Sequence, residues 1–197
     1  MILPYTVRSG MYGKWKYDPR GVKVLPDGRV QLNPGSNYGA GIEFDERRLG
    51  VYEVTCSGRW DGLNPNAIAA VWLFDPAQPA GNELDLEILQ GGNQSNVERT
   101  LLSCYLPGLK QVRKPIGSHE KHKVTLSYEK HVSRVLYQVW DLLQGKWIAW
   151  AFLEVKKENL PGCNLRITVA LKDNRLMAGT AKGNNVVTVD SVAFTAA

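Results

Sequence analysis

The chain has 197 residues, a formal net charge of +5, 44% hydrophobic residues and 22% charged residues, which describes one ordinary globular domain spanning residues 1–197. It has no apolar run long enough to cross a bilayer, so we expect no membrane partner. Its basic residues are scattered rather than gathered in a stripe with interleaved aromatic residues, so we expect no nucleic-acid partner.

The N-terminal part predicts short strands and no helix. Met1–Tyr5 lacks the charged and apolar regions of a secretory signal, which leaves the location open between cytoplasm, virion and secretion after removal of a signal. Residues 1–20 are expected to form a first strand and the loop that leads into it. β-Branched and aromatic runs between turn signals then predict strands at Val22–Leu25, Arg29–Leu32, Ala40–Phe44 and Gly50–Ser57.

The middle of the chain holds the most informative segment. An apolar strand at Ile68–Phe74 is followed by a loop rich in Pro, Gly and Asn, and then by a strand at Glu83–Leu89. Side chains alternate between the two faces of a strand, so Glu83, Asp85 and Glu87 share one face. Three adjacent carboxylates repel one another and contribute no stability. They suit acid/base and nucleophilic chemistry on a sugar, although a solvated outer face is the alternative.

The remaining strands complete an all-β pattern. They are expected at Thr100–Tyr105, His122–Tyr128, Val132–Trp140, Trp147–Phe152, Leu165–Ala170 and Val186–Phe194. About twelve strands without alternating helices predict two packed antiparallel sheets. On these strands we expect Trp140, Trp147 and Trp150 to lie in the core rather than on a ligand surface.

The three cysteines do not have the spacing of a zinc site. Cys56 and Cys104 fall in predicted strands and are expected to be small buried residues, while Cys163 lies elsewhere. A disulfide between any two of them stays open, and no local signature indicates a catalytic thiol.

Three segments follow one another along the chain: Gly50–Val54, the apolar strand ending at Trp72–Phe74, and Asn82–Glu87. Their order resembles that in the family 16 glycoside hydrolases. These are laminarinases, lichenases, agarases and carrageenases. The resemblance implies an all-β, two-sheet antiparallel β-sandwich, a concanavalin A-like jelly roll with a concave substrate cleft. It covers roughly residues 20–195, and the acidic strand in its context is its most specific part.

The resemblance also implies roles for the three acids. Glu83 matches the nucleophile, Glu87 the general acid/base, and Asp85 the assisting aspartate between them. The implied activity is endo-acting hydrolysis of a β-linked polysaccharide, of β-glucan or galactan type, by double displacement with retention of configuration. A retaining mechanism needs the two carboxyl groups about 5–5.5 Å apart, while four residues of flat strand span about 13 Å, so the strand must bend.

Further residues are expected to contact substrate in the implied cleft, with core packing as the alternative for the tryptophan at position 72. They are Tyr38, Trp60, Trp72, Ser103 and Tyr105. Gly81, Asn82, Leu101 and Ser103 depart from the family pattern around the catalytic strand, which points to a substrate other than that of the best-known lichenases.

No cofactor is required by this interpretation, although Asp190 on the closing strand could hold a structural calcium as in many family members. The partner is a polysaccharide or oligosaccharide, and we expect a monomer. Two alternatives stay open: a non-catalytic carbohydrate-binding jelly roll, and a phage or viral structural domain with a glycan-depolymerase role.

Overall fold

The computed structural model of the chain is built almost entirely of strands. The structure describes residues 2, 4–12, 15–35, 37–44, 50–57, 67–74, 83–89, 99–104, 110–115, 121–129, 134–154, 166–173 and 186–196. Among these residues the one helical element is a single 3-10 turn, η1 (Pro19–Gly21), which Asp18 caps through the Arg20 backbone N–H. No helix in this part of the chain is long and apolar enough to span a bilayer.

The first sheet has seven antiparallel strands, and the acidic strand β9 lies inside it rather than at an edge. In spatial order the strands are β1 (Thr6–Val7), β6 (Ala40–Phe44), β15 (Arg166–Asp173), β8 (Ala67–Phe74), β9 (Glu83–Leu89), β10 (Arg99–Cys104) and β11 (Lys110–Pro115).

The second sheet also has seven antiparallel strands. In spatial order they are β14 (Lys146–Glu154), β13 (Arg134–Asp141), β12 (Lys121–Glu129), β7 (Gly50–Ser57), β16 (Val187–Ala196), β5 (Val30–Leu32) and β4 (Val22–Val24). A third, two-stranded sheet pairs β2 (Gly10–Tyr12) with β3 (Trp15–Tyr17), and Lys16 on β3 accepts a hydrogen bond from the backbone N–H of Gly39, next to β6. The prediction of an all-β sandwich of two antiparallel sheets is confirmed.

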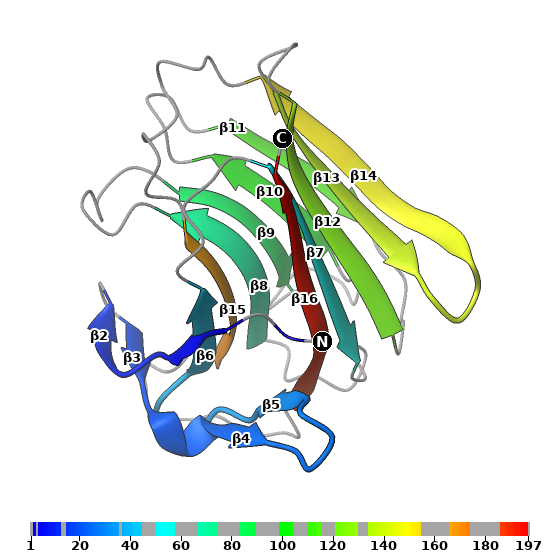
Figure 1. Cartoon of the computed structure of the whole chain (residues 1–197). Helices are drawn as coiled ribbons and strands as arrows, with labels where there is room; N and C mark the ends of the chain where they lie inside the picture. The colour runs from blue at the N-terminus through cyan, green and yellow to red at the C-terminus, as the bar shows by residue number, and fades with distance from the viewer. Residues whose placement is uncertain are drawn as a thin grey trace.

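The core lies between the two sheets, and strict alternation along the strands builds it. In β7, Tyr52, Val54 and Cys56 are buried while the residues between them are partly exposed. In the first sheet, Ile42 and Phe44 are at most 1% exposed. Figure 1 shows the two layers, with β8, β9 and β10 bowed so that their convex side faces the second sheet.

Gly50, the first residue of the Gly50–Val54 motif, starts β7 at a point where no side chain fits. A Cβ added there would lie 2.3 Å from the Thr195 carbonyl oxygen and 2.7 Å from the Phe194 ring on β16. The Phe194 ring packs in turn on Tyr52, with 4.7 Å between the ring centroids. A glycine at this position therefore lets β7 and β16, the central pair of the second sheet, approach closely.

Four strands were not predicted as such from the sequence. β11 has the sequence KQVRKP, which has few of the β-branched and aromatic residues that mark a strand. It is an edge strand, and natural edge strands often carry Lys, Arg and Pro because these residues discourage pairing with another chain. Residues 1–20 form three very short strands, β1 to β3, instead of one.

The expectation that Trp147 and Trp150 lie in the core is wrong, since their side chains are 48% and 58% exposed. β14 is an edge strand, and a register shift beside Val139 changes which of its residues face outward. The expectation for Cys56 is confirmed: it is a free, buried thiol whose pKa is raised to about 12 by burial. Cys163 lies outside the described residues.

Candidate functional site

The strand register fixes which face of the first sheet carries the acidic positions of β9. Val71 on β8 is 6% exposed and pairs with Leu86, so the even positions of β9 face the core. Positions 83, 85 and 87 therefore lie on the opposite face, which we call the acidic face. This is the hollow side of the bowed strands in Figure 1.

One row of paired residues crosses the whole acidic face at its centre. Asp85 pairs with Trp72 on β8 and with Ser103 on β10. We call this set the central row, and from β1 to β11 it consists of Thr6, Glu43, Thr168, Trp72, Asp85, Ser103 and Gln111. The register thus brings two of the predicted substrate contacts, Trp72 and Ser103, to positions directly beside Asp85.

The two glutamate positions have less polar neighbours. Position 87 lies between Ala70 on β8 and Leu101 on β10. Position 83 pairs with Phe74 near the end of β8. The three acidic positions therefore differ in surroundings, with the polar serine and the indole beside Asp85 and apolar residues beside Glu87.

Glu43 is a charged residue of the central row that sequence analysis did not single out. Its carboxylate Oε2 lies 3.8 Å from Arg8 Nε, and both side chains are largely buried, at 12% and 8% exposure. The Arg8 guanidinium lies over the Tyr17 ring, 4.8 Å from its centroid. The signal for Glu43 was present, because it is the single charged residue in the apolar run Ala40–Phe44. Arg8 had no such signal.

Tyr38 lies in the connection before β6 and is partly exposed. Its ring packs directly over Gly35, where an added Cβ would lie 2.3 Å away, and the Arg20 guanidinium stands 5.1 Å from its centroid. Arg20 is held by two hydrogen bonds to the Asp18 carboxylate, which lower the pKa of Asp18 to about 2. Tyr38 is therefore fixed in place, and its role as a substrate contact stays a prediction. Trp60 and Tyr105 lie outside the described residues.

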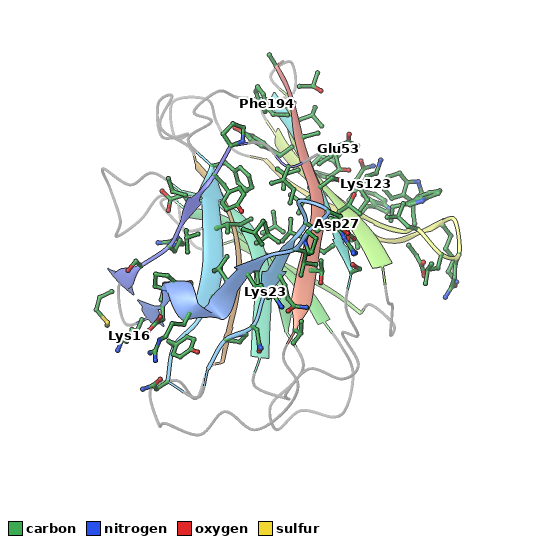
Figure 2. The ribbon with its side chains drawn as sticks, turned by 60° about the horizontal axis from the view of Figure 1, so that its bottom comes forward. Lys16, Lys23, Asp27, Glu53, Lys123 and Phe194 are labelled. Carbon is green, nitrogen blue, oxygen red and sulfur yellow. The ribbon has the colours of Figure 1, made fainter. Side chains whose placement is uncertain are left out.

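Asp190, the predicted calcium ligand, lies at a register shift in β16 between Val189 and Ser191. Its Oδ1 accepts hydrogen bonds from the Ser57 hydroxyl at 3.0 Å and from Arg29 Nη1 at 3.3 Å. Its Oδ2 is buried and has no hydrogen-bond partner within the described part of the chain. Figure 2 shows Asp27, whose carboxylate accepts a 2.7 Å hydrogen bond from Arg29 Nε, close to β16.

The described surroundings of Asp190 suit a guanidinium better than a calcium ion. Calcium takes six to eight oxygen ligands, whereas one carboxylate oxygen of Asp190 already faces the Arg29 cation. No group of three carboxylate, histidine or cysteine side chains gathers around a common point among the described residues. Calcium at Asp190 stays untested, and the ion pair with Arg29 argues against it; Oδ2 is the oxygen that Asp190 has left to offer an ion.

Chelation of divalent cations is therefore expected to change the melting temperature by less than about 1 °C. If a calcium site existed, free calcium at a hundred times its dissociation constant would add about 2.7 kcal/mol to the free energy of unfolding. For a domain of this size that raises the melting temperature by roughly 5–10 °C. Differential scanning calorimetry with EDTA and with added calcium measures this directly. A calcium-dependent rise of several degrees, lost in Asp190→Asn, would instead establish the metal site.

Comparison with known proteins identifies the fold. No family model and no curated protein matches the sequence. Among solved structures, the Bacillus licheniformis β-glucanase has a TM-score of 0.67 at 13% identity, covering 98% of this chain and 92% of that one. A family 16 hydrolase for mixed-linkage glucan from Bacteroides ovatus, solved with a product, gives 0.67 at 14% identity, covering 97% and 94%. The chain thus has the fold of the family 16 glycoside hydrolases.

The same fold also occurs in a protein described as a pseudo-β-1,3-glucanase. This Mycobacterium tuberculosis antigen gives a TM-score of 0.65 at 15% identity, covering 98% of this chain and 91% of that one. Because identity is so low, the fold by itself does not decide between cleavage and binding.

Proposed function

We propose that the chain is an endo-acting, retaining glycoside hydrolase that cleaves a β-linked glucan or galactan. The observation that carries the proposal is the acidic strand β9, whose three acids occupy alternate positions inside the first sheet and on the face away from the core. Natural sheets do not collect carboxylates in this way for stability, since like charges on one face repel. The similarity of the fold to β-glucanases supports the same conclusion.

In the proposed mechanism, Glu83 attacks the anomeric carbon while Glu87 donates its proton to the departing glycosidic oxygen. Glu87 then removes a proton from water, which attacks the glycosyl-enzyme and releases Glu83. Each step inverts the anomeric carbon, so the product retains its configuration.

The glycan is proposed to lie along the central row, across the strands. Trp72 and Ser103 flank Asp85 in this row, and an aromatic ring beside hydroxyl and carboxyl groups suits a sugar, which has apolar ring faces and polar edges. Glu43 lies farther along the same row, three strands away from Asp85, where it and its ion-pair partner Arg8 would contact a more distant sugar.

The test is release of reducing ends from laminarin, lichenan, agarose and carrageenan, with the anomeric configuration of the first product followed by proton NMR. We expect release from at least one of the four with a fall in polymer length that precedes appearance of small sugars. Binding to a glycan without release would favour the second candidate, a non-catalytic carbohydrate-binding domain. The similarity to a protein described as a pseudo-glucanase is the observation that favours a chain of this fold without catalysis.

A further inference from the structure

Exposed apolar side chains gather on one part of the second sheet. Eight large hydrophobic residues are exposed in the described part of the chain, and five of them lie in β14 and the turn before it. These five are Leu142, Leu143, Trp147, Trp150 and Phe152. Exposed apolar groups of this size are uncommon on proteins that bind nothing there.

The register of β13 and β14 places three of these aromatic residues on one face. Val139 is buried and pairs with Ala149, so Trp150 and Phe152 lie on the outer face of the sheet, away from the core. The pairing then shifts by one residue, and Trp147 instead of Ile148 stands opposite Trp140. This bulge brings Trp147 to the face of Trp150. We call Trp140, Trp147, Trp150 and Phe152 the aromatic surface.

The rings of the aromatic surface have defined orientations. Trp140 and Trp147 meet edge to face, with centroids 4.7 Å apart and planes at 80°. The Trp150 and Phe152 rings are nearly parallel, at 13°, with centroids 6.5 Å apart. Two nearly parallel rings on one strand offer neighbouring faces of similar orientation to a flat ligand.

Polar groups border the rings on the same face, although the partner of Phe152 is the apolar Leu136. Gln138 is the register partner of Trp150, and Lys123 is the partner of Trp140. Lys123 Nζ forms a 2.9 Å ion pair with Glu53, and Figure 2 shows the two side chains next to each other. A protein-binding patch usually has a continuous apolar centre, whereas aromatic faces bordered by amide, ammonium and carboxylate groups suit a sugar, which has apolar ring faces and hydroxyl edges.

The turn before β14 holds the strand in a fixed position. The buried Asp141 carboxylate accepts hydrogen bonds from the backbone N–H groups of Leu143 and Gln144, at 2.8 and 2.9 Å. Gly145 closes the turn with a φ of 62°. A surface built on a rigid hairpin loses little conformational entropy when a ligand binds.

We propose that the aromatic surface is a second, non-catalytic binding site for the polysaccharide, on the sheet opposite to the acidic face. The proposal rests on the proposed function for the identity of its ligand. The central row ends at Gln111 on β11, and β11 lies beside β14, where the edges of the two sheets meet. A glycan leaving the acidic face at β11 reaches the aromatic surface by passing round this edge, where the backbone planes of the two sheets are about 10 Å apart.

The test uses the chain with Glu87→Gln, which blocks turnover, in native gels that contain laminarin or lichenan. Trp147→Ala and Trp150→Ala, added together to this background, are expected to lower the apparent affinity for the polymer at least about tenfold. Met11→Ala and Val24→Ala remove equally exposed apolar side chains elsewhere and should leave the affinity unchanged. Equal melting temperatures establish that all versions are folded.

The outcomes separate this proposal from the proposed function. If polysaccharide in the gel slows the migration of the tryptophan variants less than that of the parent chain, the second site is supported, even if the wild-type chain releases no sugar. Retardation that is the same with and without the tryptophans overturns the second site and leaves the hydrolase proposal standing. A dimer that dissociates on replacement of Trp150 would also overturn it, because the surface would then join two copies of the chain.

Discussion

Replacing Glu87 by glutamine is expected to lower kcat by about 10²- to 10⁴-fold, the contribution of a positioned acid/base group, and replacing the nucleophile Glu83 is expected to lower it by at least as much. The fold should be unaffected, because both positions lie on the face of β9 that is turned away from the core. Initial rates of reducing-end release on the polysaccharide that the wild type cleaves measure the effect. Circular dichroism and melting temperatures show that the variants are folded.

Azide distinguishes the roles of the two glutamates. In Glu83→Ala, azide attacks the anomeric carbon in place of the missing nucleophile, and the glycosyl azide has inverted configuration. In Glu87→Ala, an aryl glycoside with a good leaving group still forms the glycosyl-enzyme, which azide then traps with overall retention. Asp27→Asn is the matched control, since it removes an exposed carboxylate on the β4–β5 turn and should keep the wild-type rate.

Near-wild-type activity in either glutamine variant would remove that residue from the mechanism. Two glycosyl azides of the same configuration would overturn the division of roles between Glu83 and Glu87. Retention of the full binding affinity together with loss of turnover in both variants is what the proposal requires.

The part of the fold that sequence analysis predicted is the part in which one face of a strand is buried and the other is not. Ala40–Phe44, Gly50–Ser57 and Glu83–Leu89 have the predicted bounds in the structure, because alternation or a continuous apolar run marks each of them. β11 was not predicted because an edge strand needs few apolar residues, and its lysines and arginine are equally typical of an exposed loop.

The candidate site could be predicted only where its residues are neighbours along one strand. The acids of β9 are neighbours along one strand, so alternation alone brings them to one face. Arg8 and Glu43 are distant in the sequence and meet because a two-residue strand, β1, pairs with β6. Trp147 and Trp150 owe their exposure to an edge position and to a shift of register, neither of which leaves a pattern in the sequence.

Phe44→Ala is expected to lower the free energy of unfolding by about 3–5 kcal/mol. The ring is 1% exposed, on the core face of β6 opposite Ile167 of β15, and Tyr5 contacts it edge-on with centroids 6.1 Å apart. Because the free energy of unfolding of a native domain is only about 5–15 kcal/mol, this loss is a large part of it. The midpoint of unfolding should therefore move to a much lower urea concentration. The size of the loss follows from the cavity that the missing ring leaves between the sheets.

Val24→Ala is the control, since Val24 is 59% exposed on the edge strand β4 and its replacement should change the free energy of unfolding by less than about 0.5 kcal/mol. The burial of Phe44 also bears on function. Phe44 and Glu43 are adjacent on β6, so the burial of one places the other on the acidic face, three strands from Asp85. A loss below about 1 kcal/mol in Phe44→Ala would contradict this orientation of the sheet, and with it the assignment of the acidic face.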